Sequence, residues 1–126
     1  VKALQNRYVS IVAHPTGRLL GQREPYQVDL QEVFRAARET NTALEINSCT
    51  QRLDLNDLHA RQAREAGVKL VVSTDTHSLD QLDSIGLGIS MARRAWVEPE
   101  DLLNTLDLKD LLVWVAKKRQ PATTRT

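Results

Sequence analysis

The sequence is poor in cysteine, in aromatic residues and in excess charge of either sign. Cys49 is the only cysteine among 126 residues, which excludes an internal disulfide and fits a reducing compartment such as the cytoplasm. Seventeen basic and 16 acidic residues give a formal net charge of +1, so the basic excess typical of nucleic-acid-binding domains is missing. Aromatic residues make up only 4% of the chain and do not form the interleaved pattern of a base-stacking platform.

Long apolar runs, signal-peptide patterns, internal repeats and low-complexity linkers are also missing. We therefore expect a soluble, cytoplasmic chain with no membrane partner. The content of hydrophobic residues (41%) and of charged residues (26%) is ordinary for a globular protein, and the length is sufficient to bury a core. Only residues 120–126 are expected to form a flexible tail.

The stretch 68–78, VKLVVSTDTHS, is an apolar run that ends in a carboxylate and an imidazole. Its apolar part reads as a strand buried on both faces of a parallel sheet. Residues i and i+2 of an extended chain point to the same side, so Asp75 and His77 can present an oxygen and a nitrogen to one point. This spacing predicts half of a metal site, and the alternative is that Asp75 caps a following helix.

A second apolar strand candidate, residues 8–14, ends in a histidine, and Pro15-Thr16-Gly17-Arg18 then begins a loop. The two strands would deliver His14, Asp75 and His77 to one rim of the sheet. Histidine nitrogen and aspartate oxygen are common ligands of zinc and manganese, and three of them leave coordination positions open for water or substrate. The alternative for His14 is a strand-end histidine bonded to a backbone carbonyl.

Turn and cap signals divide the rest of the chain into alternating helices and strands, which implies parallel strands joined by crossovers. The expected elements are a helix capped at Asp29 and running to about Thr40, a strand at 43–47, a helix capped by Asp54 or Asn56 and ended by Gly67, a strand at 68–74, a helix from Ser78 through Ile85, a strand or turn around Leu87, a helix from Pro99 to Leu106 and a helix capped at Asp107.

Three motifs in this order carry a family resemblance. They are HPTGR (14–18), ALEIN (43–47) and STDTHS (73–78), supported by the segments 19–26, 54–57 and 92–96. Together they resemble the later motifs of the PHP (polymerase and histidinol phosphatase) family, in the version found at the carboxyl end of bacterial and archaeal family X DNA polymerases. The resemblance covers essentially the whole chain.

The resemblance implies an α/β fold, the carboxyl-terminal part of a distorted (β/α)7 barrel in which parallel strands alternate with helices. Residues 1–119 would form this carboxyl-terminal portion. The family's first motif, His-x-His, and its middle motifs are not found in the 126 residues, and such barrels need upwards of ~200 residues. We therefore expect the chain to be an incomplete barrel and part of a larger protein.

The resemblance also implies a metal-dependent phosphoesterase in which His14, Asp75 and His77 bind divalent ions, Mn²⁺ or Zn²⁺. The expected activity of the parent protein is 3′-5′ exonuclease or DNA-end processing, with DNA, the remaining barrel and a polymerase domain as partners. The chain alone is expected to be inactive. The alternatives are a small-molecule phosphatase of the histidinol-phosphate type and a non-catalytic half barrel that forms a homodimer to cover its open sheet edge.

Two further residues are candidates for contact with the substrate. Arg18 could bind phosphate in bidentate fashion, and the alternative is a surface ion pair with Glu24. Glu45 ends its own strand and could line the site, and the alternative is a supporting or structural role.

For other chemistry-bearing residues the sequence favours ordinary roles. His59 is interpreted as a solvated helix residue, Cys49 as a packing or exposed thiol and not a nucleophile, and Trp96 and Trp114 as core or inter-element contacts. The basic pair at 93–94 and the basic triplet at 117–119 could follow a DNA backbone. Because cations at the end of a helix are usually solvated, we interpret both as solvated surface charges.

Overall fold

The computed structural model describes residues 1–119, so the tail predicted at 120–126 lies outside the described residues. Its centre is a three-stranded sheet of parallel strands in the order β1-β2-β3. These are β1 (Ile11–Val12), β2 (Ala43–Asn47) and β3 (Leu70–Ser73). Ile11 pairs with Ala43, and Leu44 pairs with Leu70. The alternating, parallel architecture predicted from the sequence is confirmed, although β1 and β3 are shorter than the expected strands 8–13 and 68–74.

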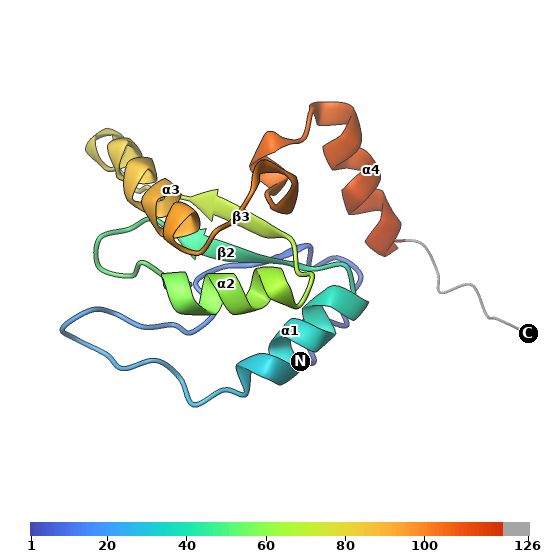
Figure 1. Cartoon of the computed structure of the whole chain (residues 1–126), viewed down its shortest axis with the longest axis horizontal. Helices are drawn as coiled ribbons and strands as arrows, with labels where there is room; N and C mark the ends of the chain where they lie inside the picture. The colour runs from blue at the N-terminus through green and yellow to red at the C-terminus, as the bar shows by residue number, and fades with distance from the viewer. Residues whose placement is uncertain (120–126) are drawn as a thin grey trace, which may run out of the picture.

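Of the four α-helices in residues 1–119, three share one hydrophobic core with the apolar side chains of this sheet. In Figure 1, α1 (Leu30–Glu39) and α2 (Asp57–Glu65) lie below the strands, and α3 (Ile85–Arg94) and α4 (Leu108–Arg119) lie above them. Residues 1–119 also contain three short 3₁₀ helices: η1 (Leu79–Ser84), η2 (Pro99–Asp101) and η3 (Leu103–Thr105). No helix within 1–119 is long and apolar enough to cross a membrane.

The expected start signals hold for three of the helices. The Asp29 carboxylate accepts the Glu32 N–H at 3.1 Å, and the Asp107 carboxylate accepts the Asp110 N–H at 2.8 Å. Of the two caps considered for α2, Asn56 fills the position and accepts the His59 N–H at 2.8 Å. Asp54 is therefore not the cap of α2, and its contacts are described below.

The predictions for residues 78–106 were partly wrong. Ser78 makes no side-chain cap, and the segment after it is a 3₁₀ helix. The strand or turn expected at Gly86-Leu87-Gly88 is instead the first half of α3, because Gly88 lets the helix approach the sheet. A Cβ built on Gly88 would lie 1.9 Å from Ser48 Oγ and 2.6 Å from Val72 Cγ1. The expected helix Pro99–Leu106 is divided into η2 and η3.

The hydrophobic core lies where α1, α2 and α3 meet the sheet. Its largest fully buried apolar side chains are Phe34, Leu44, Ile46, Leu55 and Leu70. On α2 the buried face is made by Ala60 and Ala63, while Leu58 is 59% exposed. Small residues on that face let α2 lie close to the strands.

The outer edge of β3 is partly closed by the chain itself. Leu70 forms a parallel bridge with Leu102. The Asn104 side chain bonds the backbone of Val72 as a neighbouring strand would. It accepts the Val72 N–H at 2.8 Å and donates to the Val72 carbonyl at 2.9 Å. The amide thus satisfies backbone groups that an open edge would leave unpaired.

Helix α4 is held to the start of the chain by one amine. Lys118 Nζ donates to the Leu4 carbonyl at 2.9 Å, to the Val9 carbonyl and to the Thr42 hydroxyl. These three bonds use all three donors of an ammonium group. Burial lowers the pKa of Lys118, and this residue is a structural anchor rather than a solvated cation.

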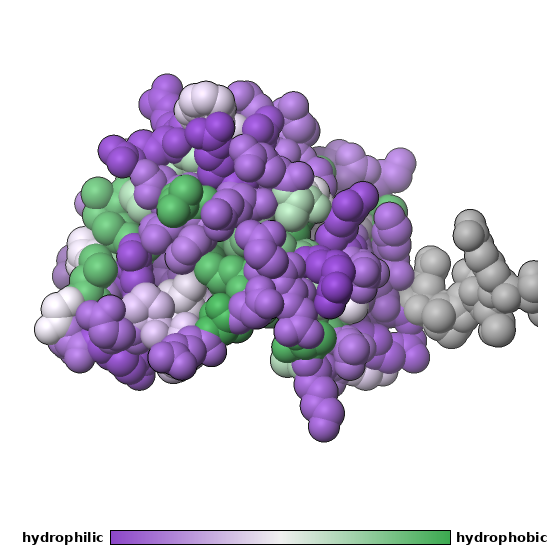
Figure 2. All heavy atoms as spheres, turned by 60° about the horizontal axis from the view of Figure 1, so that its bottom comes forward, coloured by the Kyte–Doolittle hydropathy of each residue, from purple (hydrophilic) through white to green (hydrophobic). Residues whose placement is uncertain are grey.

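On the face of the molecule that Figure 2 shows, the apolar side chains form separate patches broken by polar side chains. No residue of α4 is buried within the described chain, and its Leu108, Leu112 and Val113 are 72%, 59% and 62% exposed.

Candidate functional site

The candidate site lies at the carboxyl ends of β2 and β3, where parallel strands collect polar groups. A single amide connects two carboxylates there. Asn47 Nδ2 lies 3.1 Å from Glu45 Oε2 and 3.2 Å from Asp75 Oδ2. Asn47 and Glu45 alternate with Leu44 and Ile46 along β2, so the strand presents its polar groups to one side and its apolar groups to the other.

Glu45 is the most enclosed acid of this cluster, with a relative exposure of 6%. Besides Asn47, it accepts hydrogen bonds from the backbone N–H of His14 and from the hydroxyl of Ser73. It therefore links the ends of all three strands. Both interpretations of Glu45, a residue that lines the site and a supporting or structural residue, stay predictions.

Asp75 follows β3 with a backbone φ of +53°, a left-handed conformation that aspartate tolerates better than most residues. Its carboxylate accepts a hydrogen bond from the Asn47 side-chain amide. It also forms an ion pair with Arg52, whose Nε lies 3.3 Å from Oδ2. It does not cap the following helix, whose first turn has no side-chain cap. The carboxylate thus points toward β2.

His77 lies on the surface beside Asp75. Its Nδ1 is 2.7 Å from the Asp75 backbone carbonyl. Since a carbonyl oxygen can only accept, Nδ1 is the donor of this bond, and in the neutral ring the lone pair is then on Nε2. This is the orientation that a histidine needs when the second nitrogen binds a metal ion.

His14 begins the loop after β1 with a φ of +31°, where a side chain with a Cβ is strained. The loop is held by Asp54, which is fully buried and accepts the N–H groups of Thr16 and Gly17 at 2.9 and 3.0 Å. The backbone of Asp54 also pairs with Asn47. Asp54 therefore fixes the His14 loop relative to β2.

The environment of Asp54 opposes its negative charge. Burial raises the pKa of Asp54, whereas the hydrogen bonds from Thr16 and Gly17 and the nearby charge of Arg18 act in the opposite direction. Its Oδ1 is buried without a hydrogen-bond partner among the described residues.

Arg18 makes contacts that neither sequence interpretation anticipated. Its Nε donates to the Arg52 carbonyl at 2.7 Å, and its Nη2 donates to the Leu53 carbonyl. The side chain thereby ties the His14 loop to the loop that supplies Arg52. No ion pair with Glu24 forms within residues 1–119.

The interpretation of His59 as a solvated residue was wrong. The side chain is half-buried, and its Nδ1 is buried without a hydrogen-bond partner in the described part of the chain. Burial lowers the pKa of His59 below its ordinary value of 6.5, partly offset by the charge of Asp54 and reinforced by that of Arg18.

This burial makes the stability of the fold sensitive to mild acid. Because the unfolded chain binds a proton on His59 more readily than the folded chain does, stability should fall as the pH drops below 6.5. We expect a His59→Gln variant to lose less stability than the wild type between about pH 7.5 and pH 5.5. Urea midpoints at the two pH values measure this, and an equal loss in both proteins would contradict it.

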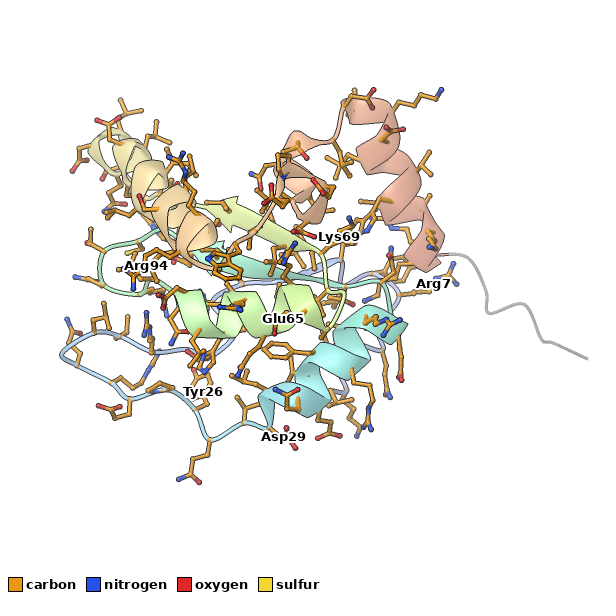
Figure 3. All side chains as sticks on the ribbon, viewed as in Figure 1. Arg7, Tyr26, Asp29, Glu65, Lys69 and Arg94 are labelled. Atoms are coloured by element: carbon orange, nitrogen blue, oxygen red, sulfur yellow. The ribbon has the colours of Figure 1, made fainter. Side chains whose placement is uncertain are left out.

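Several surface residues are engaged in structural contacts. Arg94 forms an ion pair with Asp57 at 2.8 Å, and Figure 3 shows it at the end of α3, above the first turn of α2. Trp96 is 61% exposed rather than part of the core, but it does make the expected inter-element contact, with the Arg61 guanidinium 4.1 Å from its ring centroid. Cys49 is a half-buried free thiol.

The donor atoms suit a divalent cation in kind, although not in number. Carboxylate oxygens and a histidine Nε2 are the ligand types that manganese and zinc accept. Within residues 1–119, however, no three His, Cys, Asp or Glu side chains converge closely enough to hold an ion. Glu45 accepts the His14 backbone N–H, Asn47 donates to the Asp75 carboxylate, and His77 contacts the Asp75 carbonyl. The role of His14, Asp75 and His77 as ligands stays a prediction.

In α/β scaffolds of parallel strands, functional side chains collect at the carboxyl edge, and carboxylates placed there can hold the metal ions of a hydrolase. Comparison with known proteins agrees. The chain is 47% identical over 109 residues to the DNA polymerase/3′-5′ exonuclease PolX of Bacillus subtilis (strain 168), a match that covers 86% of this chain and 19% of that protein.

The chain is also 26% identical to a probable phosphatase of Thermoanaerobacter sp. (strain X514) and 28% identical to one of Shewanella halifaxensis (strain HAW-EB4). The first match covers 95% of this chain and 49% of the phosphatase, and the second covers 82% and 42%. No family model matches the sequence. These relatives confirm the resemblance to the PHP family and to its family X polymerase branch, and the chain spans half or less of each relative's length.

Proposed function

We propose that this chain forms the carboxyl-terminal part of a seven-stranded PHP barrel that hydrolyses phosphodiester bonds at the 3′ ends of DNA. The observation that carries the proposal is the pair of carboxylates, Glu45 and Asp75, bridged by Asn47 at the carboxyl edge of the sheet. The 47% identity to a protein named as a polymerase and 3′-5′ exonuclease supports the choice of DNA as substrate.

In this proposal Asp75 and His77 bind a divalent ion from β3, and His14 binds from the loop after β1. The ion, Mn²⁺ or Zn²⁺, would neutralise the phosphate and lower the pKa of a water molecule. The chain's own residues prepare the geometry. Asn47 orients the two carboxylates, and the Asp75 carbonyl fixes the proton of His77 on Nδ1.

Arg52 is the cation nearest to this cluster and pairs with Asp75. It is available to contact a phosphate oxygen when an ion takes over the Asp75 carboxylate. Arg18 acts indirectly, because its bonds to the Arg52 and Leu53 carbonyls position that loop.

Metal binding tests the proposal. We expect the wild-type chain to bind Mn²⁺ and the triple variant His14→Ala, Asp75→Ala, His77→Ala to bind it at least about tenfold more weakly. Electron paramagnetic resonance titration measures free Mn²⁺, and plasma mass spectrometry of the purified chain identifies a retained metal. A His59→Gln variant controls for loss of an imidazole away from the rim. Equal affinity in the wild type and the triple variant would overturn the assignment.

Two other functions have specific support. The probable phosphatases match the chain over a larger share of their own length, which favours a small-molecule phosphatase. The lack of three converging ligands within the described residues favours a non-catalytic half barrel for the isolated chain, in which case it should show little hydrolysis by itself. The parent protein's hydrolysis of 3′-end-labelled oligonucleotides can be compared with its hydrolysis of amino-alcohol and sugar phosphates. This comparison separates DNA-end hydrolysis from small-molecule phosphatase activity.

A further inference from the structure

A cavity of about 300 Å³ opens beside the candidate site. Three segments form it: the loop after β2, the end of β3 and the 3₁₀ helix η1. Its lining residues are Cys49, Thr50, Gln51, Thr74, Asp80, Gln81 and Ser84. The volume lies at the lower end of the range for small-molecule sites.

The cavity is connected to the rim by direct hydrogen bonds on two sides. The Cys49 N–H donates to Asn47 Oδ1 at 3.0 Å, and the same amide group holds Glu45 and Asp75 through its nitrogen. On the other side the His77 N–H donates to Gln81 Oε1 at 2.8 Å. A molecule bound to the rim therefore has this cavity as its immediate neighbour.

The lining offers no cationic side chain to a phosphate. Two glutamines, three residues with hydroxyl groups and one aspartate line the cavity, and no lysine or arginine is among them. Side-chain amides bind the edges of nucleobases through paired donors and acceptors, and carboxylates accept from exocyclic amines. Since Gln81 uses its oxygen for His77, its Nε2 donors remain for a ligand.

We propose that this cavity binds a nucleoside, the base and sugar attached to the phosphate that is positioned at the rim. The proposal rests on the proposed function for the neighbouring phosphate, but the binding itself needs no metal. Gln51 and Gln81 contact the base edge, and the Thr50 hydroxyl supplies a further polar contact. The hydroxyls of Ser84 and Thr74 are bonded to the Gln81 carbonyl and to the Thr76 hydroxyl.

Cys49, the only cysteine of the chain, lines the cavity, so the reactivity of its thiol can report whether the cavity is occupied. We expect deoxynucleosides to slow the reaction of Cys49 with a disulfide reagent such as dithionitrobenzoate. At a concentration of about twice Kd, two thirds of the sites are filled and the reaction slows about threefold. Inorganic phosphate and amino alcohols should leave the rate unchanged, and protection by amino alcohols instead would overturn the proposal.

Two glutamine variants form a matched pair. In Gln51→Leu the protection should disappear, whereas Gln22→Leu, an exposed glutamine outside the cavity, should keep it. Chemical shifts of the glutamine side-chain amides on addition of deoxynucleoside provide a second measurement that does not depend on thiol reactivity. No protection and no shift in the wild type, or equal protection in Gln51→Leu, would overturn the proposal.

This result can be separated from that of the proposed function. Loss of Mn²⁺ binding in the triple variant without nucleoside protection would leave the metal site standing and remove the nucleoside cavity. Protection without Mn²⁺ binding would support the cavity and count against the phosphoesterase.

Discussion

Replacing Asp54 with leucine should destabilise the fold by about 2–4 kcal/mol, because the N–H groups of Thr16 and Gly17 lose their buried acceptor. Leucine is similar in size but offers no oxygen. The carboxylate also connects two loops of the candidate site, so the His14 loop should loosen at the same time. Urea unfolding monitored by circular dichroism measures the change in midpoint at constant slope.

Asp54→Asn is the matched control for this substitution. An amide oxygen can still accept both N–H groups, and the neutral side chain avoids the burial of charge that raises the pKa of Asp54. We expect a loss of less than about 1 kcal/mol. The folded-state pKa is raised, so the cost of burying the ionised form is present at neutral pH and vanishes at low pH. The stability of the asparagine variant relative to the wild type should therefore be highest near pH 7. Equal losses of stability in the leucine and asparagine variants would contradict the role of the hydrogen bonds.

Replacing Gly88 with alanine should cost about 1–3 kcal/mol, although alanine is ordinarily the better residue in a helix. The new methyl group would overlap Ser48 Oγ and Val72 Cγ1. Helix α3 would have to move away from the sheet directly behind Asn47. Thermal unfolding of the purified variant tests this expectation.

Gly86→Ala supplies a control in the same helix. A Cβ at Gly86 meets nothing within 4 Å, so the substitution should stabilise the chain by roughly 0.5–1 kcal/mol. The two glycines should thus give effects of opposite sign. A gain in stability from both substitutions would show that α3 is not closely packed against β2 and β3.

The strands were predictable because their apolar runs were flanked by clear stop signals. ALEIN at 43–47 is β2 with its expected bounds, and Gly67 ends α2 with a φ of +79°. By contrast, Gly86 and Gly88 suggested an interruption, since local propensity penalises glycine in helices. Packing of α3 against Ser48 outweighed that local preference, and such a contact between distant segments leaves no periodic pattern in the sequence.

Three residues of the candidate site were proposed from the sequence, but the residues that connect them were not. His14, Asp75 and His77 follow apolar strands, which made them visible. Asn47 and Ser73 were not assigned a role, although Glu45 and Asn47 have the same i, i+2 spacing as Asp75 and His77, and this signal could have identified Asn47.

Asp54 and Arg18 were assigned by their nearest sequence patterns, a helix cap for one and a phosphate contact or ion pair for the other. Their partners lie more than 30 residues away along the chain. Only the folded backbone brings those carbonyl and amide groups within reach. His59 was misjudged for the same reason, because its burial comes from its tertiary surroundings rather than from its own helix.

The register of the sheet has a consequence for the order of folding. Both strand pairings join residues more than about 25 positions apart, and no hairpin can form first because the strands are parallel. Each pairing must close a long loop before it gains any hydrogen bond, which makes the sheet slow to form compared with the helices. The bonds of Glu45 to His14 and Ser73 span both crossovers. The acidic cluster should therefore assemble only as the last crossover closes, and its appearance would report completion of the fold rather than an early intermediate.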